Sequence, residues 1–430
     1  MDRIKIRGGA KLNGAIPISG AKNAALPLMI ASLLTDQTLT LENLPRLADV
    51  SQLIRILGNH GVDYSVDGKR MGEDATAGQT AHLRAKTIVD TTAPYELVSR
   101  MRASFWVIAP LLARMGEARV SLPGGCAIGT RPVDFLLMAL EKLGVHIEIE
   151  SGYAVAKAPK GLIGGEIDFP KVTVGGTHTA LMAAATAHGS TLIRNAAREP
   201  EVKDLADCLI KMGARIKGAG TSEIEVTGVT RLNGARHAVL PDRIEAGTYA
   251  AAVAMTGGDV LLEGVGADLF KEALDALSQA GATVTEENRG VRIKRNGAGI
   301  SPVDISTAPF PGFPTDLQAQ LMALLALGDG ISVITERIFP DRFLHVGELN
   351  RMGGRIRKDG ATAIVQGVKE LQGASVMASD LRASAALVLA GLVAKGTTQI
   401  DRVYHIDRGY EKIEQKLRAL GADIVRVKEK

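Results

Sequence analysis

The feature that most constrains this 430-residue chain is a unit that recurs along it and ends each time in an amphipathic helix, a glycine and a strand. The glycine stands where a helix C-terminus needs a left-handed residue, and aliphatic residues beyond it begin the strand. The six glycines are Gly61, Gly144, Gly213, Gly281, Gly353 and Gly421. Because one such unit cannot bury its apolar face alone, the repeat predicts an assembly of similar α/β units.

A second helix of different character is expected upstream of each glycine-capped helix. It is rich in alanine and apolar on nearly every side, and such a helix must be buried on all sides. These inner helices are expected at Asn23–Leu34, Arg102–Met115, His178–His188, Thr248–Thr256, Leu317–Leu327 and Arg382–Ala394. Short strands are expected after them, at Thr38–Leu41, Arg119–Leu122, Thr191–Ile193, Val260–Leu262, Ile331–Ile334 and Thr398–Ile400. Each unit therefore pairs an enclosed inner helix with a half-exposed outer helix.

The chain is long enough for two domains, since single hydrophobic cores rarely grow beyond about 250–300 residues. Its two halves match, with a boundary near Leu240–Ile244. The expected packing is three units around three buried helices, made twice, with sheet outside the inner helices. The strand-like segment Met1–Gly20 precedes the first unit and could complete either domain.

Composition restricts the class of protein. With 46% apolar and 23% charged residues, the chain is typical of soluble globular proteins. Its longest apolar runs fall short of the ~18–20 residues of a membrane span, and its charged start lacks a signal peptide's apolar core. Two cysteines cannot form a disulfide framework. We therefore expect a cytoplasmic protein.

Other ligand classes receive little support from the sequence. The net charge of +4 is mild and no basic run is interleaved with aromatic residues, so nucleic-acid binding is not expected. The chain lacks the sequence spacings of a metal site, a nucleotide P-loop and a dinucleotide fingerprint. We expect no metal and no cofactor.

Polar residues interrupt the apolar pattern just before, or in, the first turn of the expected inner helices. They are Lys22, Asn23, Arg100, Arg102, Lys171, Asp242, Arg243, Asp316, Asp380 and Arg382. Residues at equivalent positions of the repeats should lie at the same end of the domain. The positive N-termini of the inner helices are therefore expected to converge there. Two such ends that face one another would form an anion-attracting cleft.

Two interpretations of these polar residues remain open. Aspartate is a preferred helix cap, so ordinary capping explains Asp242, Asp316 and Asp380 as well as a functional role does. Arginine and lysine are poor caps, and a cation at the positive end of a helix is electrostatically unfavourable. Lys22, Arg102 and Arg382 therefore favour a strongly negative ligand, with a carboxylate base nearby.

A glycine-rich segment, Leu122–Asp134, places Cys126 beside Arg131. Arg131 would favour the thiolate and could hold a phosphate or carboxylate, while the glycines would let the loop open and close. A hairpin with an inert buried thiol is the alternative. The other cysteine, Cys208, follows the apolar spacing of an outer helix and is expected in the core.

Five segments, in chain order, resemble motifs of the UDP-N-acetylglucosamine 1-carboxyvinyltransferases, a family of enolpyruvyl transferases that begins bacterial peptidoglycan synthesis. The segments are Ser19–Pro27, Leu122–Asp134, Ala308–Asp316, Ala378–Ser384 and Tyr404–Glu411. The resemblance implies two similar domains, each of three βαβαββ repeats forming an inside-out α/β barrel, with the active site in the interdomain cleft. It assigns residues 21–240 to one domain and residues 1–20 plus 241–430 to the other.

The resemblance also implies substrates and residue roles. Lys22, Arg131 and Arg408 would hold the phosphate and carboxylate of phosphoenolpyruvate, with Asn23 and Arg382 nearby. The residues expected to bind UDP-N-acetylglucosamine are Arg102, Arg131, Pro132, Val133, Asp134, Phe135, Lys171, Val172, Thr173, Val174, Asp316 and Ile338, and Asp380 completes the substrate-binding set.

The expected catalytic residues are Cys126, Asp316, Lys22 and Arg408. Cys126 corresponds to the family's loop cysteine, a proton donor able to form an adduct with phosphoenolpyruvate, and is the expected target of a phosphonate epoxide inhibitor. Asp316 is the best candidate to accept the hydroxyl proton of the sugar.

Two other functions remain as alternatives. A shikimate-type enolpyruvyl transferase would share the fold and phosphoenolpyruvate, but the Pro-Gly-Gly-Cys loop argues against it. A non-catalytic repeat scaffold would present recognition surfaces without a matched acid, base and set of cations, because folds are readily reused. Exchanging the acceptor substrate separates the two enzymatic readings.

Overall fold

The computed structural model describes residues 2–67, 78–124, 133–296 and 299–428. These residues form two compact units. The first unit contains the described residues from Ser19 to Leu240, and the second contains those up to Ile18 and from Pro241 onward.

The described residues of each unit form three four-stranded sheets with one shared pattern. In each sheet one pair of strands is parallel and the other two pairs are antiparallel. The strands of the first unit are β3 (Leu39–Leu44), β4 (Asp63–Val66), β5 (Gln79–Arg84), β6 (Thr92–Ala93), β7 (Glu117–Ser121), β8 (His146–Glu150), β9 (Tyr153–Lys157), β10 (Glu166–Asp168), β11 (Ser190–Arg194), β12 (Arg215–Lys217), β13 (Glu223–Thr227) and β14 (Ala235–Ala238). This recurrence confirms the repeat that the sequence predicts.

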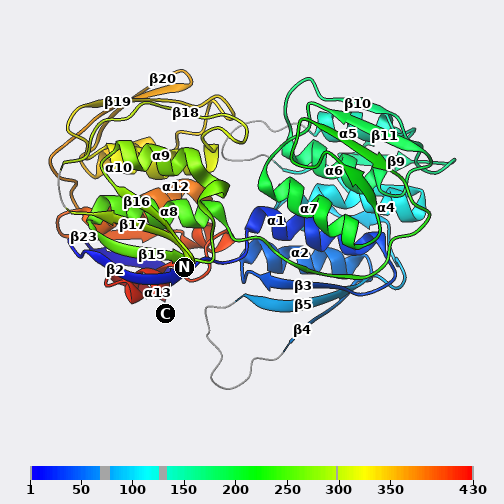
Figure 1. Ribbon diagram of the computed structural model, residues 1–430, viewed down its shortest axis with the longest axis horizontal. Coiled ribbons are helices and arrows are strands. Elements are labelled where there is room, and N and C mark those ends of the chain that lie inside the picture. Colours follow the sequence, from blue (N-terminus) through cyan, green and yellow to red (C-terminus); the bar gives the residue numbers. More distant parts are fainter. Residues whose placement is uncertain (1, 68–77, 125–132, 297–298, 429–430) are drawn as a thin grey trace. The chain divides into compact units, whose positions relative to one another are not determined.

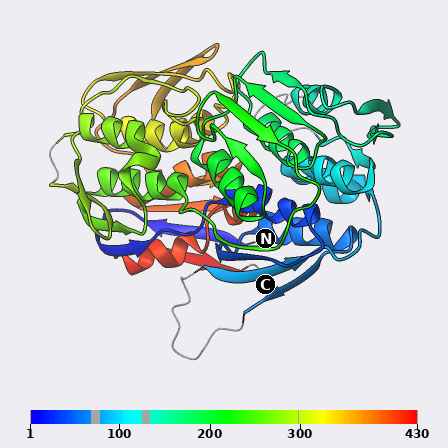
Figure 2. The same cartoon turned by 45° about the vertical axis from the view of Figure 1, so that its right-hand side comes forward.

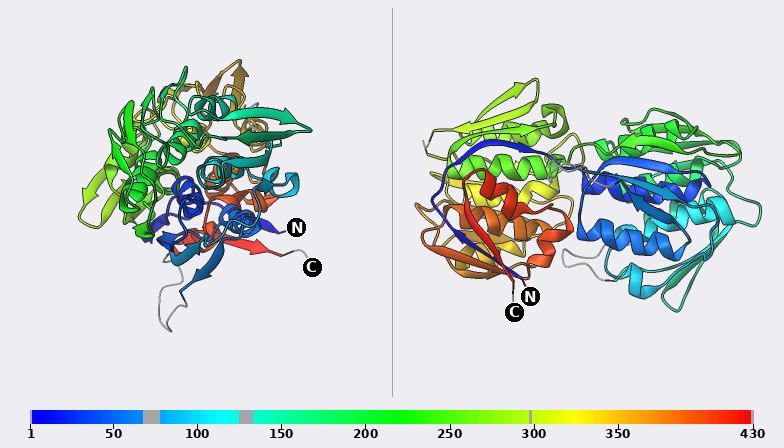
Figure 3. Two further views of the ribbon diagram at one scale, coloured as in Figure 1. Left: turned by 90° about the vertical axis from the view of Figure 1, so that its right-hand side faces the viewer. Right: turned by 90° about the horizontal axis from the view of Figure 1, so that it is seen from below.

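The second unit uses both ends of the chain. Its strands are β1 (Arg3–Arg7), β2 (Leu12–Pro17), β15 (Gly258–Glu263), β16 (Thr283–Glu287), β17 (Gly290–Arg295), β18 (Ile305–Ser306), β19 (Ile331–Thr335), β20 (Arg355–Asp359), β21 (Thr362–Gln366), β22 (Ser375–Met377), β23 (Thr397–Asp401) and β24 (Asp423–Val427). Strand β1 lies between β23 and β24, and β2 pairs in parallel with β15. The dark-blue N-terminal strands accordingly lie beside the red C-terminal segment in Figure 2 and in the right-hand view of Figure 3. The N-terminal strands β1 and β2 therefore join two sheets of the second unit.

The inner helices are present and enclosed, as their apolar sequences predict. They are α1 (Lys22–Ala31) with η1 (Ser32–Leu34), η2 (Arg102–Val107) with α4 (Ile108–Met115), α6 (Val174–Ala184), α8 (Arg243–Thr256), η4 (Thr315–Leu317) with α10 (Gln318–Leu325), and α12 (Leu381–Val393). Helices α6 and α8 begin earlier than expected, because Thr173 and Asp242 cap them with side-chain hydrogen bonds. The segment expected as one helix from Arg102 is a 3₁₀ helix up to Val107, and Pro110 has no N–H to give the preceding turn an α-helical hydrogen bond.

Within the second unit, α8, α10 and α12 pack against one another, and Figure 1 shows them enclosed by the strands of that unit. Gly247 makes this packing possible, since a Cβ there would lie 2.4 Å from Cδ1 of Leu317. A hydrophobic core of buried residues surrounds the three helices. A second core fills the first unit around α1, α4 and α6.

The outer helices carry the predicted glycine caps. These helices are α2 (Ala48–Asn59), α5 (Asp134–Glu141), α7 (Pro200–Lys211), α9 (Lys271–Gln279), α11 (His345–Arg351) and α13 (Ile413–Ala419). The glycines that follow them have φ angles of 92° (Gly61), 83° (Gly144), 106° (Gly213), 104° (Gly281), 94° (Gly353) and 105° (Gly421). All six adopt the left-handed conformation, which confirms the capping prediction. Three short segments, α3 (Tyr95–Val98), η3 (Ala267–Phe270) and η5 (Val403–Arg408), join these elements.

Candidate functional site

Lys22 is the first residue of α1, and its ammonium group is paired inside the first unit. Its Nζ lies 2.7 Å from Oδ2 of Asp49, which belongs to the first turn of α2. Both side chains are largely buried, with exposed fractions of 12% and 6%. The carboxylate therefore offsets the unfavourable position of a cation at the positive end of a helix. It also fixes the ammonium group at the start of α1.

Three elements of the first unit that carry predicted sugar-nucleotide residues meet around Gly175. A Cβ at Gly175 would lie 3.0 Å from Nε1 of Trp106 in η2 and 3.6 Å from Cδ1 of Leu136 in α5. Arg102 begins η2, Asp134 begins α5 and Val174 begins α6. The fold thus brings the starts of α5 and α6 to the helix that Arg102 begins, although these residues are distant in sequence.

The remaining predicted residues of the first unit differ in exposure. Lys171 and Val172 are exposed, while Asn23, Arg102, Val133 and Phe135 are partly buried. Thr173 caps α6, since its Oγ1 accepts a hydrogen bond of 3.2 Å from the N–H of Gly176. Cys126, Arg131 and Pro132 lie outside the described residues.

Cys208 lies in α7 with no exposed surface, which confirms its predicted place in the core. Burial raises the pKa of its thiol to about 12, and the charge of Asp204 adds to the rise while Lys211 opposes it. A thiol with this pKa is almost entirely protonated near neutral pH, so Cys208 is a poor nucleophile.

In the second unit, Asp316 lies between two arginines. Its Oδ1 accepts a hydrogen bond of 2.7 Å from Nη1 of Arg342, and its Oδ2 accepts one of 2.9 Å from Nη2 of Arg382. The side chains of Arg342 and Arg382 are 8% and 2% exposed, whereas that of Asp316 is 22% exposed. Arg382 also lies over the ring of Tyr410, with 5.5 Å from its Cζ to the ring centroid.

This arrangement controls the protonation of Asp316. Burial acts to raise the pKa of its carboxyl, but the charges and hydrogen bonds of Arg382 and Arg342 outweigh it and hold the pKa well below the usual range. Burial likewise acts to lower the pKa of Arg382, and the charge of Asp316 leads the interactions that raise it instead. Asp316 is therefore a carboxylate at any pH near neutrality.

The starts of the other inner helices show which aspartates are caps. Oδ1 of Asp242 accepts from the N–H groups of Ile244 and Glu245 at 2.8 and 3.0 Å. Asp380 does the same for Arg382 and Ala383 at 2.9 and 3.0 Å. The capping interpretation therefore describes Asp242 and Asp380, whereas the side chain of Asp316 is directed to arginines.

One inference from the sequence needs correction here. The sequence predicts an external anion at Lys22 and Arg382, because a cation at a helix N-terminus is unfavourable. The structure supplies an internal anion to each, Asp49 for Lys22 and Asp316 for Arg382. Their positions alone are therefore not evidence for a bound ligand.

Polar contacts join the starts of the inner helices of the second unit. Nε2 of Gln320 in α10 donates to Oγ1 of Thr248 in α8, to the hydroxyl of Tyr410 and to the carbonyl of Asp316, at 3.0, 3.2 and 3.0 Å. Arg408 ends η5, which packs against α12. The convergence predicted from the repeat is therefore observed in this unit. It places a carboxylate, several cations and neutral hydrogen-bonding groups together, which suits proton transfer beside an anionic substrate.

Two residues with evident roles were missed by reasoning from sequence. Asp49 lies in the first turn of an outer helix, where an acidic residue is ordinary, and Arg342 lies in the irregular segment after β19. The sequence does indicate that a charged residue at the start of an apolar helix, such as Lys22 or Asp316, needs a partner of opposite charge. Nothing in the local sequence says which residue supplies it.

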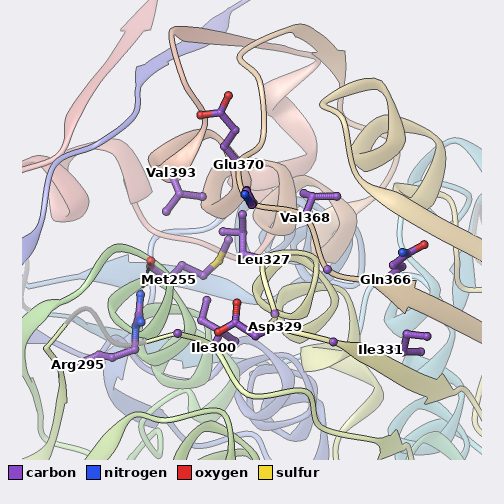
Figure 4. A pocket seen from close by; sticks show the side chains of 15 residues that line it. Met255, Arg295, Ile300, Leu327, Asp329, Ile331, Gln366, Val368, Glu370 and Val393 are labelled. Carbon is purple, nitrogen blue, oxygen red and sulfur yellow. Dashed lines mark hydrogen bonds between the residues drawn. The ribbon is translucent and has the colours of Figure 1, made fainter.

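The second unit also holds a cavity of about 580 Å³ at the other end of its inner helices (Figure 4). Met255, Leu327 and Val393, at the carboxyl ends of α8, α10 and α12, line it together with the charged side chains of Arg295 and Asp329. The predicted site residues of this unit are at the helix starts or in the segments beside them, so the cavity does not belong to the site described above.

Among the described residues, no group of three or more His, Cys, Asp or Glu side chains is placed to hold a metal ion. No helix in the described ranges has the length and apolar character to cross a membrane.

Comparison with known proteins identifies the family. Residues 6–417 match the model of the family described as EPSP synthase (3-phosphoshikimate 1-carboxyvinyltransferase). The chain is 70% identical over 427 residues to UDP-N-acetylglucosamine 1-carboxyvinyltransferase of Methylocella silvestris, covering 99% of this chain and 100% of the relative. It is 69% identical to the protein of the same name from Beijerinckia indica, covering 99% of each chain.

Solved structures agree with the observed fold. The enolpyruvyl transferase NikO from Streptomyces tendae superposes with a TM-score of 0.85 at 25% identity, covering 99% of this chain and 98% of that chain. EPSP synthase from Acinetobacter baumannii gives a TM-score of 0.75 at 18% identity, covering 100% of each chain, and so supports the fold alone. The two-domain fold of inside-out α/β barrels expected from the sequence is thus confirmed. The chain belongs to the enolpyruvyl transferase family and, within it, to the UDP-N-acetylglucosamine 1-carboxyvinyltransferases.

Proposed function

We propose that this chain transfers the enolpyruvyl group of phosphoenolpyruvate to the 3-hydroxyl of UDP-N-acetylglucosamine and releases phosphate, the first committed step of peptidoglycan synthesis. The observation that carries this proposal is 70% identity over 99% of the chain to a relative named for that reaction. A cytoplasmic location is part of the same proposal, in keeping with a chain of only two cysteines.

The residues assigned to phosphoenolpyruvate are cations and one amide. Lys22, Arg131 and Arg408 bind its phosphate and carboxylate, with Asn23 and Arg382 nearby. Charge-assisted hydrogen bonds of this kind are the strongest that a protein offers to an anion. For Lys22 the observed pair with Asp49 supports the role, because a fixed ammonium group loses little freedom when it binds phosphate.

UDP-N-acetylglucosamine is assigned to residues of both units. Those of the first unit are Arg102, Arg131, Pro132, Val133, Asp134, Phe135, Lys171, Val172, Thr173 and Val174, and those of the second are Asp316 and Ile338. Asp380 is assigned to substrate binding without a choice between the two substrates. The convergence of η2, α5 and α6 around Gly175 supports the first group. The contact between Asp316 and Arg382 supports the second.

The chemistry begins with a proton that Cys126 gives to C3 of phosphoenolpyruvate, which makes C2 electrophilic. The 3-hydroxyl of the sugar adds to C2, its proton passes to Asp316, and a tetrahedral adduct forms. The Cys126 thiolate then takes a C3 proton back as the C2–O bond to phosphate breaks, which releases phosphate and gives the enolpyruvyl ether. Cys126 is also the residue that forms an adduct with phosphoenolpyruvate and that a phosphonate epoxide would alkylate.

The environment of Asp316 shapes its part in this scheme. Two arginines make its carboxylate a weak base, so it cannot remove a proton from a free hydroxyl group in advance. The hydroxyl becomes far more acidic as its oxygen bonds to C2. We therefore expect the proton to reach Asp316 together with C–O bond formation, in general base catalysis.

The experiment that tests the function is inorganic phosphate release from phosphoenolpyruvate with either acceptor. Release that requires UDP-N-acetylglucosamine supports the proposal. Release that requires shikimate 3-phosphate instead would assign the chain to the shikimate-type alternative, whose description the matching family model bears. If no phosphate is released with either acceptor at any concentration tested, the result would favour the non-catalytic scaffold.

A further inference from the structure

Glu336 is a fully buried carboxylate for which the mechanism above has no use. It directly follows β19, and no part of its side chain is exposed to solvent. An isolated buried carboxylate is strongly unfavourable, so its partners explain its presence. Among the described residues, each of these partners donates a hydrogen bond to it.

The first group of donors holds the segment that leaves β19. Oε1 of Glu336 accepts from the N–H groups of Ile338 and Phe339 at 2.9 and 3.0 Å, and from Oγ1 of Thr307 at 2.7 Å. Thr307 Oγ1 in turn accepts from the N–H of Arg337 at 2.8 Å. Glu336 therefore fixes the backbone at Ile338, one of the residues assigned to the sugar nucleotide.

The second carboxylate oxygen of Glu336 is connected to Asp316 through hydrogen bonds. Oε2 of Glu336 accepts a hydrogen bond of 2.9 Å from Oγ1 of Thr315, the residue before Asp316. Nη1 of Arg342 donates to the same Oγ1 at 3.1 Å and to Oδ1 of Asp316 at 2.7 Å. A hydroxyl group has one proton, and a guanidinium can only donate. Thr315 therefore gives its proton to Glu336 and presents a lone pair to Arg342.

We propose that Glu336 and Thr315 are positioning residues that hold Arg342 against Asp316 and thereby set the geometry and the basicity of the proton acceptor. The inference rests on the proposed function and deepens it. Neither side chain is assigned contact with substrate. Each acts through Arg342, whose side chain is 8% exposed and has little freedom to find another partner.

The main test replaces Thr315 by valine, which has nearly the same shape but no hydroxyl group. Arg342 then loses one of the two acceptors that it has among the described residues, so its contact with Asp316 weakens. We expect kcat/KM to fall on the order of 10–100-fold, as for other displaced catalytic groups. T315S restores the hydroxyl group and should recover most of the activity.

The matched control is Thr398→Val in the same unit. Thr398 is also fully buried, and its hydroxyl makes no hydrogen bond with the described residues. This variant should keep kcat/KM within about twofold of the wild type, since it breaks no contact of the network.

The pH dependence of kcat/KM separates positioning from simple loss of folded protein. The charged groups that face Asp316 are Arg342 from the segment after β19 and Arg382 from α12. Arg382 also interacts electrostatically with Asp242 and Tyr410. A weaker contact with Arg342 raises the pKa of Asp316, so in Thr315→Val the acidic limb of the profile should move to higher pH. A smaller folded fraction lowers the whole profile and leaves that limb in place.

A second variant, Glu336→Asp, keeps the charge and shortens the side chain by one methylene. It cannot reach both Thr315 and the backbone N–H groups, so we expect a loss of kcat/KM similar to that of Thr315→Val. Calorimetric titration with UDP-N-acetylglucosamine gives the fraction of each variant that is folded and competent to bind, and rates are corrected for it.

The outcomes are distinct. The proposal is overturned if Thr315→Val matches Thr398→Val in corrected kcat/KM and in the position of the acidic limb, or if Glu336→Asp has the corrected activity of the wild type. Wild-type protein that releases no phosphate with UDP-N-acetylglucosamine overturns the proposed function instead. A low rate in Thr315→Val that T315S does not recover would also reject the hydroxyl group as the cause.

Discussion

Nη2 of Arg382 lies 2.9 Å from Oδ2 of Asp316, and this pair joins the starts of two inner helices, α10 and α12. The guanidinium of Arg342 donates a hydrogen bond of 2.7 Å to the other oxygen of this carboxylate. The residue that we assign as proton acceptor is therefore held by charge as well as by packing. Its chemistry depends on groups that are far from it in sequence.

Replacing Asp316 by asparagine should reduce turnover by about 10²–10⁴-fold, because an amide keeps the shape but cannot take a proton. Calorimetry should still detect UDP-N-acetylglucosamine binding. Asp242→Asn is the matched control, since asparagine caps a helix as well as aspartate does, and we expect it to remain active. Near-normal turnover in Asp316→Asn would remove Asp316 from the proton transfer.

Replacing Lys22 by glutamine should lower kcat/KM for phosphoenolpyruvate by about 10–100-fold, the usual effect of losing one charge-assisted hydrogen bond of roughly 1.5–3 kcal/mol. It should also destabilise the first unit, because Asp49 is left as a buried carboxylate without its ammonium partner. Steady-state rates at varied phosphoenolpyruvate and thermal unfolding measure the two effects. Lys86→Gln, at an exposed position, controls for the loss of one positive charge. An unchanged kcat/KM in Lys22→Gln would contradict the phosphate-binding role.

Stability should fall as the pH is lowered from 6.5 toward 4. Burial lowers the pKa of His178 to about 4 and likewise lowers the pKa of His345 to about 4. In this window the unfolded chain binds more protons than the folded protein does. The free energy of unfolding therefore rises with pH, by up to about 1.4 kcal/mol per pH unit for each histidine.

Urea unfolding at a series of pH values measures this slope. His178→Gln should reduce it, because glutamine does not titrate. Equal slopes in the wild type and in His178→Gln would show that this histidine is not buried in its neutral form.

A phosphonate epoxide that mimics phosphoenolpyruvate should alkylate Cys126 and spare Cys208. Burial raises the pKa of Cys208 to about 12, so it holds almost no thiolate. Cys126 has Arg131 nearby in sequence and belongs to a glycine-rich segment. Peptide mass mapping after brief exposure measures the two rates, and Cys126→Ser should abolish labelling. Labelling of Cys208 first, or of both cysteines equally, would contradict the assignment of Cys126.

The sequence predicted the parts of the fold that depend on local patterns. Helices that are apolar on all sides had to be enclosed, and glycines such as Gly213 and Gly421 had to end the outer helices, since both requirements are local. Helix starts were less well predicted. The first five residues of α8 include the charged Arg243 and Glu245, so the pattern marked Thr248 as the beginning. Asp242, six residues before Thr248, is the residue that caps the helix.

The site was predicted less completely, for a physical reason. Asp316 and Arg382 were recognised because polar residues at the start of an apolar helix stand out. Their partners do not stand out, since Asp49 and Arg342 occupy positions where a charged residue is ordinary. An ion pair between distant segments is visible only when the fold brings the two charges together.

The central claim, that this chain makes an enolpyruvyl ether of UDP-N-acetylglucosamine, is tested most directly by identifying the product. The purified protein is incubated with phosphoenolpyruvate labelled with ¹³C at C2 and with UDP-N-acetylglucosamine and shikimate 3-phosphate together, and the products are analysed by mass spectrometry and NMR. We predict that the label appears in an enolpyruvyl group bonded to the 3-oxygen of the sugar nucleotide, in equal amount to the phosphate released. Label transferred to shikimate 3-phosphate, or to neither acceptor, would contradict the account.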